Sequence, residues 1–180
     1  MQESNIQTNN QHDSNRDPER LRIDINVMHD IELDENRLQE IVLKILVDHS
    51  VESAEISLAV VNDQQIHELN RQYLDHDYAT DVLSFDLGCD SGSVQLTGEV
   101  IVSADTAIQN AAERKIKATD ELSLYVIHGT LHLVGHDDKQ DDARKEMRLA
   151  EQKYAAAFGL QYRNPDRDSD DNSELADGAG

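Results

Sequence analysis

Residues 122–138 read L-S-L-Y-V-I-H-G-T-L-H-L-V-G-H-D-D, and this stretch decides the fold. Its apolar residues recur at helical spacing and continue around most of the circumference, which predicts a helix buried in the core. His128 and His132 are four residues apart, so they lie one above the other on the same helical face. The stretch therefore predicts a buried helix with two imidazoles on one wall.

A glycine turn follows this helix. Gly135 can adopt the left-handed conformation that ends a helix and turns the chain back. Counted from His128, the spacing H-x-x-x-H-x-x-G-x-x-D is similar to the metzincin zinc motif H-E-x-x-H-x-x-G-x-x-H, with Asp138 in the third-ligand place and Gly129 in place of the glutamate. A catalytic zinc takes three such protein ligands and keeps a fourth position open for water. We therefore predict a metal site made by His128, His132 and Asp138.

The third ligand has a second candidate. His136 is a better zinc donor by type than a carboxylate, but on a continued helix it would lie about 6 Å along the axis from His132. Gly135 ends the helix first, so Asp138 is preferred and His136 stays the alternative. The histidines could also be structural, but each neutral ring would then need its own buried partner. Metal binding is the favoured interpretation.

Composition limits the class of protein. The chain has 38% hydrophobic and 4% aromatic residues, so we expect an aliphatic core, and its single cysteine, Cys89, excludes an internal disulfide. The sequence has no apolar run long enough to span a membrane, and residues 1–10 lack the basic start and apolar centre of a signal peptide. We expect a cytoplasmic protein. The net charge of −21 argues against holding nucleic acid by charge alone.

The chain is expected to form one domain between two polar ends. Residues 1–20 predict a disordered N-terminal arm, residues 163–180 a disordered acidic tail, and residues 21–162 the domain. Hydrophobic periodicity predicts strands at 21–28, 55–61, 80–85 and 98–103, and helices at 35–49, 64–74, 105–116, from 119, and 141–159. This order predicts an α+β domain of the three-layer type, in which helices pack on a four-stranded mixed sheet.

Smaller features carry further expectations. Ile66, Leu69 and Tyr73 should face inward from the 64–74 helix, and Cys89 should lie in a loop. The basic run at 114–117 suits the C-terminal end of a helix, and we favour that electrostatic role over phosphate contact. The charges of the 141–159 helix alternate in sign, as on a solvated face.

Two longer segments resemble one known family. H-G-T-L-H-L-V-G-H-D-D at 128–138 is similar to H-G-x-L-H-L-x-G-Y/H-D-H of the YbeY family of bacterial metal-dependent endoribonucleases, also called rRNA maturation factors. L-N-R-Q-Y-L-D-H-D-Y-A-T-D-V-L-S-F at 69–85 is similar to the family's L-N-x-x-Y-R and T-D-V-L-S-F segments, and G-E-V-I at 98–101 to the strand between the two motifs. The resemblance extends from about Ile23 to Phe158.

The resemblance implies the family's small α/β domain and its zinc site. The family's third ligand is a histidine, whereas this chain has Asp138, and two histidines with one carboxylate also suit ferrous iron. We expect one Zn²⁺ per chain, with Fe²⁺ or another divalent metal as alternatives. The family's arginine after the tyrosine, thought to contact RNA, is Leu74 here. Asp81 and Ser84, in the other motif, could face the metal, although a structural role for Asp81 is preferred.

The implied function is a zinc-dependent, single-strand-specific endoribonuclease that matures the 3′ end of small-subunit (16S) rRNA and serves ribosome quality control. Its partners would be single-stranded RNA, precursor small-subunit rRNA and the small ribosomal subunit, without DNA or membrane. His128, His132 and Asp138 would act through the metal. One alternative is a non-enzymatic ribosome assembly factor with a structural metal. The other is a peptidase, which Gly129 disfavours because the motif's glutamate base is missing.

Overall fold

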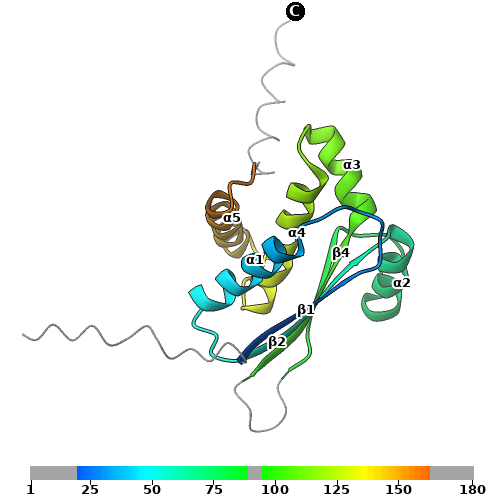
Figure 1. Cartoon of the computed structure of the whole chain (residues 1–180). Helices are drawn as coiled ribbons and strands as arrows, with labels where there is room; N and C mark the ends of the chain where they lie inside the picture. Colours follow the sequence, from blue (N-terminus) through cyan, green and yellow to red (C-terminus); the bar gives the residue numbers. More distant parts are fainter. Residues whose placement is uncertain (1–19, 89–94, 163–180) are drawn as a thin grey trace, which may run out of the picture.

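A four-stranded mixed sheet forms the centre of the domain (Figure 1). The computed structural model describes residues 20–88 and 95–162. The strands are β1 (Leu21–Val27), β2 (Ala54–Val61), β3 (Val82–Asp86) and β4 (Leu96–Ser103), in the spatial order β1-β2-β4-β3. β1, β2 and β4 are parallel, and β3 runs antiparallel along β4 at the edge. Such mixed sheets are buried on the faces that their connecting helices cover.

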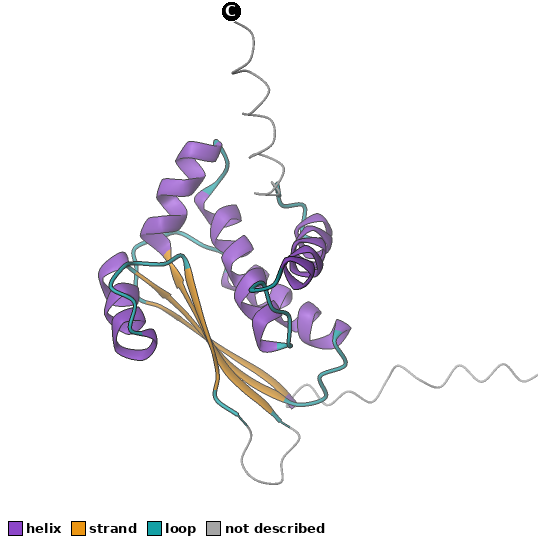
Figure 2. Ribbon diagram, turned by 180° about the vertical axis from the view of Figure 1, so that it is seen from behind, coloured by secondary structure: helices purple, strands orange, loops and turns teal. Residues whose placement is uncertain are grey.

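Helices cover both faces of the sheet, so the domain has three layers. On one side lie α1 (Glu35–Asp48), α3 (Ala104–Arg114), α4 (Ala118–Leu133) and α5 (Asp141–Ala157). The opposite side carries α2 (Asp63–Leu74), which stands apart from the other helices in the view from behind (Figure 2). The main core joins α1, α4, α5 and the sheet, and a small second core lies beneath α2. The predicted α+β fold is confirmed.

Short side-chain caps set where the helices begin. Asp34 accepts a hydrogen bond from the Arg37 amide at the start of α1, and Ser103 accepts one from the amide of Thr106 at the start of α3. Asn62 forms a capping box at the start of α2. Each cap satisfies amides that the first helical turn leaves without partners. These local signals explain why the predicted starts of α1, α2 and α3 agree with the structure to within a residue, whereas the helices at Ala118–Leu133 and Asp141–Ala157 begin without a side-chain cap.

Tyr73 departs from the prediction that it faces inward. Its side chain is 61% exposed, and its ring meets the Phe85 ring edge-on at a centroid separation of 5.5 Å. The reason is that Tyr73 lies in the last turn of α2, beside the edge strand β3, where the second core ends.

Some predictions concern residues that the structure does not describe. The loop assignment of Cys89, the acidic tail and, except for Arg20, the N-terminal arm lie outside the described residues. Within the described ranges, every helix is too short or too polar to cross a bilayer.

α4 is the central helix of the domain, and Gly129 lets it pack closely on the sheet. α4 contacts α1, α3, α5, β3 and β4. A Cβ atom added at Gly129 would lie 2.7 Å from Val100 Cγ1 and 2.9 Å from Val82 Cγ2. Ser84 also donates a hydrogen bond to the Gly129 carbonyl across 3.1 Å. This face of α4 has no room for a side chain, so the position of a protease's glutamate is closed here.

The close packing predicts that Gly129→Ala destabilises the domain. Alanine favours a helix by about 1 kcal/mol over glycine, but overpacking costs about 1–3 kcal/mol. We expect the free energy of unfolding, measured in urea, to fall. Val100→Ala should also destabilise, and the double variant Gly129→Ala/Val100→Ala should lose less than the sum of the two because the new methyl group fills the vacated space. Additive losses would contradict this packing.

Candidate metal centre

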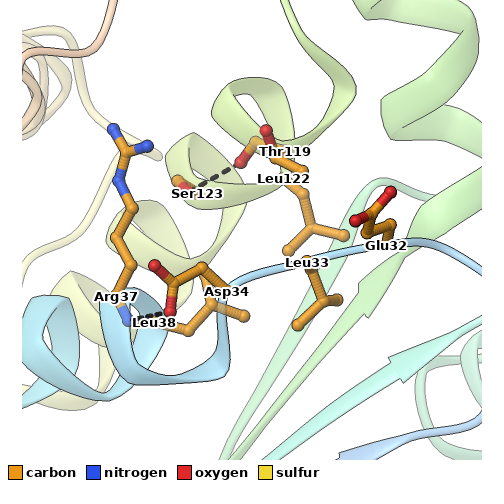
Figure 3. A pocket seen from close by; sticks show the side chains of 8 residues that line it. All are labelled: Glu32, Leu33, Asp34, Arg37, Leu38, Thr119, Leu122 and Ser123. Carbon is orange, nitrogen blue, oxygen red and sulfur yellow. Dashed lines mark hydrogen bonds between the residues drawn. The ribbon is translucent and has the colours of Figure 1, made fainter.

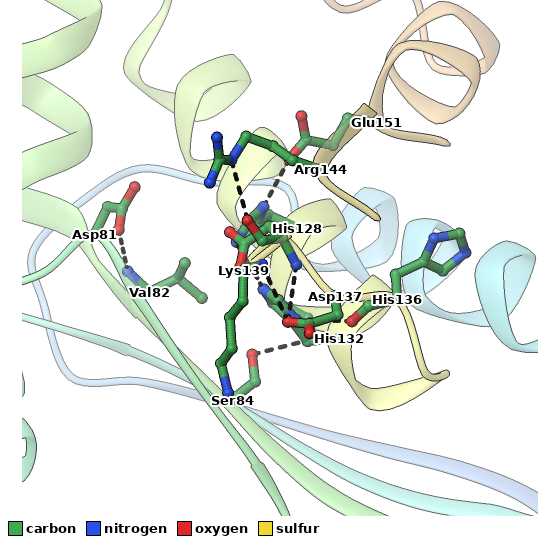
Figure 4. Close-up of polar contacts among 12 residues, drawn as sticks. Asp81, Val82, Ser84, His128, His132, His136, Asp137, Lys139, Arg144 and Glu151 are labelled. Carbon is green, nitrogen blue, oxygen red and sulfur yellow. Dashed lines mark hydrogen bonds and ion pairs between the residues drawn. The ribbon is translucent and has the colours of Figure 1, made fainter. Parts of the chain in front are cut away.

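Three side chains converge at the C-terminal end of α4, and Figure 4 labels two of them, His128 and His132. The Nε2 atoms of His128 and His132 lie 3.0 Å apart, and Asp138 Oδ2 lies 3.8 Å from the first and 4.0 Å from the second. Among the described residues, these three form the one group of histidine, cysteine or acidic side chains whose ligand atoms all lie within 4.8 Å of one another. The predicted set is therefore brought together at one point.

The turn after α4 brings Asp138 to this point. Gly135 adopts φ +97°, and the His136 amide donates to the Leu131 carbonyl at 3.0 Å, closing the helix end. A side chain at Gly135 would be strained in this left-handed conformation. Arg144 then donates from Nε to the Asp138 carbonyl at 3.1 Å, tying the turn to the start of α5.

Hydrogen bonds at Nδ1 fix the orientation of both rings. His128 Nδ1 lies 2.6 Å from Glu151 Oε1, and His132 Nδ1 lies 3.0 Å from the His136 carbonyl oxygen. Both partners are acceptors, so both Nδ1 atoms carry the hydrogen. Each neutral ring then presents its Nε2 lone pair to the same point. Two lone pairs 3.0 Å apart need a proton or a cation between them, and this pairing is typical of metal-ligating histidines.

The electrostatics of the two rings differ. Burial alone would lower the pKa of His128, but the hydrogen bond and negative charge of Glu151 outweigh it, and the pKa is raised. The pKa of His132 is lowered by burial and by the charge of its neighbour His128. Burial opposes ionisation of Glu151, yet hydrogen bonds from His128 and Tyr162 keep its pKa below its ordinary value. The pKa values of the two rings are therefore shifted in opposite directions.

This donor set suits a divalent cation. Two imidazoles and one carboxylate are nitrogen and oxygen ligands of the kind that zinc and ferrous iron accept. Asp138 is 39% exposed, so the third donor lies at the open side of the site, where a water or a substrate oxygen can approach. His128, His132 and Asp138 could hold the ion. The identity of the metal stays a prediction.

His136 lies apart from this group. Its Nε2 lies 3.0 Å from the Nε2 of His49, at the C-terminal end of α1, and the two rings meet edge-on. His49 Nδ1 is satisfied by the Ile45 carbonyl, so its Nε2 is free to accept from His136. His136 thus contributes its carbonyl to His132 while its side chain anchors the turn to α1.

Glu151 is a residue that sequence reasoning missed. It lies on α5 and is buried, whereas alternating charges had predicted a solvated face for this helix. Besides His128, it contacts Arg148 Nη1 at 3.1 Å and the Tyr162 hydroxyl at 2.5 Å. A glutamate 23 positions after His128 has no spacing signal of its own. Only the packing of α5 against α4 reveals its role.

The second motif contributes to the same region. Asp81 accepts hydrogen bonds from the Val82 amide and the Thr80 hydroxyl, which is the predicted structural role. It also lines a cleft of about 330 Å³ that His128 and Asp138 border. Ser84 is turned to the Gly129 carbonyl and so serves helix packing.

A separate pocket of about 380 Å³ lies between the loop before α1 and the first turns of α4 (Figure 3). Its arginine, Arg37, already donates to Asp120 and to the Phe158 carbonyl. None of the residues that line this pocket belongs to the metal centre, so the two are distinct.

The fold and the site define a small α+β domain with a candidate metal centre on one helix and the turn that follows. Comparison with known proteins gives the family. The family model "Endoribonuclease YbeY" matches residues 24–159. The chain therefore belongs to the YbeY endoribonuclease family, and the resemblance seen in the sequence is confirmed.

Individual relatives of the chain carry the same family name. The chain is 37% identical to an endoribonuclease YbeY of Rhodopirellula baltica over 69% of this chain and 68% of the relative. It is 36% identical to that of Salinibacter ruber over 70% of this chain and 84% of the relative. The solution structure of TM1509 from Thermotoga maritima is similar at a TM-score of 0.55, with 29% identity over 89% of this chain and 99% of that one.

The two candidates for third ligand predict different metal contents. Asp138→Ala should lose bound metal on purification or dialysis, because it removes one of three converging donors, whereas His136→Ala should retain it. Elemental analysis of both variants beside the wild type measures this directly. Loss of metal from His136→Ala with retention in Asp138→Ala would reverse the assignment.

Glu151 should matter to metal affinity without being a ligand. Loss of an outer hydrogen-bond partner typically lowers metal affinity 10- to 100-fold, so Glu151→Gln should lower it by about that factor. Competition with a chromogenic chelator measures this affinity. Glu40→Gln, an exposed glutamate of α1, is the matched control and should leave affinity unchanged. Equal affinities for wild type and Glu151→Gln would contradict the role of this hydrogen bond.

Proposed function

We propose that the chain is a metal-dependent endoribonuclease that hydrolyses single-stranded RNA at the centre formed by His128, His132 and Asp138. Family membership supports the endoribonuclease class. The observation that carries the metal dependence is the orientation of both Nε2 lone pairs toward Asp138. Zn²⁺ is the metal that we propose, and Fe²⁺ is the alternative that the carboxylate admits.

Each residue of the site has a separate task in this proposal. A bound divalent cation would supply a Lewis acid for a phosphoryl oxygen and make hydroxide available near neutral pH. His128 and His132 hold their position and tautomer through Glu151 and the His136 carbonyl. The exposed Asp138 leaves the solvent side open for the phosphodiester.

Peptide hydrolysis is disfavoured by the same geometry. Zinc proteases of the related motif keep a glutamate next to the first histidine as general base. That place is Gly129, where an added Cβ would lie 2.7 Å from Val100 Cγ1 and 2.9 Å from Val82 Cγ2, too close for a side chain. The closed space supports a nuclease rather than a protease.

The biological substrate that we propose is precursor small-subunit rRNA, cut in the maturation of the 3′ end of 16S rRNA and in ribosome quality control. This places the protein in the cytoplasm with the small ribosomal subunit as partner, and residues 21–162 as the domain responsible. The net charge of −21 supports a substrate presented by such an assembly, because this charge weakens general attraction to RNA or DNA.

One observation favours a second candidate, a ribosome assembly factor whose metal is structural. Leu74 stands where the family carries an RNA-contacting arginine, and it is 46% exposed at the end of α2. In that case chelation would lower the melting temperature strongly, with no turnover on single-stranded RNA.

The nuclease proposal predicts that His132→Ala abolishes RNA cutting and leaves the fold intact. The variant removes one of two nitrogen ligands from a partly exposed position, so cutting of a labelled single-stranded RNA should fall to background. Its circular dichroism spectrum should not change. His67→Ala, at an exposed histidine of α2 paired with Asp77, is the matched control and should cut like the wild type. Equal cutting by His132→Ala would reveal a contaminating nuclease and overturn the proposal.

A further inference from the structure

The cleft beside the metal centre continues along α4, away from the ligands. It holds about 330 Å³ and runs from His128 and Asp138 to Tyr125 and Glu121. Glu121, Tyr125 and His128 follow one another at spacings of four and three residues, so they share one face of α4. From His128 to Glu121 this face extends about 10 Å. The face of α4 that carries His128 therefore extends along the cleft beyond the metal centre.

Arg114 stands at the far end of this cleft. It is the last residue of α3, and its Nη1 lies 2.5 Å from Oε1 of Glu121. Glu121 is completely buried, whereas the Arg114 side chain is 43% exposed. The buried carboxylate therefore holds the guanidinium from below and leaves other N–H groups of its fork facing the cleft.

Arg148 is a second arginine at the cleft that is held by a buried glutamate. It lies on α5, lines the same cleft, and donates from Nη1 to Oε2 of the buried Glu151 at 3.1 Å. Two guanidinium groups from different helices thus border one cleft, each fixed by a buried acid. Glu151 also holds His128, so the position of Arg148 is coupled to that of a metal ligand.

We infer that this cleft is a subsite for the RNA backbone next to the bond that is cut, with Arg114 binding a phosphate and Glu121 as its positioning residue. The inference rests on the proposed function. Guanidinium groups bind phosphate through paired, charge-assisted hydrogen bonds. The net charge of −21 weakens general attraction for a polyanion, so local cations have to supply the contact. The cleft also carries Asp81, Glu121, Asp138 and Glu151, of which Glu121 and Glu151 are paired with the two arginines.

The location of Arg114 changes its interpretation. From the sequence, the basic run at 114–117 was favoured as compensation for a helix end. The structure turns Arg114 to the cleft that His128 and Asp138 also line, against a buried acid of the neighbouring helix. By contrast, Arg22 pairs with Asp24 and Glu55 on the outer face of the sheet.

The test compares Arg114→Gln with Arg22→Gln in the full, metal-loaded chain. Initial rates on a short single-stranded RNA are measured over a range of salt concentrations. Arg114→Gln should raise KM about tenfold, as expected for a lost charge-assisted contact, with kcat and metal content nearly unchanged. The salt slope of log kcat/KM should become shallower by about 0.7, the value for one phosphate contact on a single strand. Arg22→Gln should match the wild type.

Two further arms keep the inference falsifiable. If Arg114→Gln fails to fold because the Glu121 charge is left unpaired, Arg114→Gln/Glu121→Gln removes both charges and should show the same KM and slope. For the wild type, substrates with one neutral methylphosphonate linkage should show a KM penalty at a single linkage beside the cleavage site. Arg114→Gln should lack that penalty.

The outcomes separate the two proposals. No cutting by the wild type would overturn the proposed function and this inference with it. Cutting by the wild type with unchanged KM and salt slope in the Arg114 variants would overturn only the subsite.

Discussion

The hydrogen bond between His128 and Glu151 is the interaction on which the site depends. It joins α4 to α5 and sets the tautomer of His128, the first of the proposed metal ligands. It also brings Arg148 and Tyr162 to the same carboxylate. Because Glu151 is buried, it would be costly to leave unpaired, so the helices are held in the register that satisfies it. Ring orientation, charge at the site and the border of the cleft all follow from this contact.

The distance between α4 and the sheet is a second constraint on the site. It is set by the face of α4 that packs on the sheet, opposite the two histidines. Gly129 lies against Val82 and Val100, while His128 lines the cleft and holds its Nε2 3.0 Å from that of His132. A helix held farther from the sheet would carry the ligands away from Asp138, whose place is fixed by the Gly135 turn and by Arg144. One face of α4 thus packs on the sheet, and another carries His128 and His132. The packed face has no room for a side chain at Gly129, so it cannot carry a protease's glutamate base.

Most of the fold could be predicted from the sequence because its signals are local. Alternation marked β1, the caps at Asp34 and Asn62 marked α1 and α2, and the i, i+4 histidines with Gly135 marked the metal helix and its turn. The failures are contacts between elements. Tyr73 was placed inward because periodicity does not show where a sheet face ends. Glu151 and the pairing of Arg114 with Glu121 were missed because they depend on how α5 and α3 pack against α4. Spacing along one helix predicts a site's ligands, but its supporting residues come from other helices.

In the proposed metal centre, the aspartate at position 138 would lower the charge of a bound dication. Three neutral imidazoles leave a bound dication with its full charge of two, whereas one carboxylate among the ligands reduces the total to one. Attraction for a phosphodiester falls accordingly, and Glu151 reduces it further from beneath His128. Arg148 offsets Glu151 of its own helix, and Arg114, paired with Glu121 of the neighbouring α4, places a partly exposed guanidinium beside the cleft. A cation fixed in this way loses little side-chain entropy when a phosphate arrives, so it compensates more effectively than a mobile surface lysine would. In the proposed centre, the aspartate and the anchored arginines would therefore act on the same local charge.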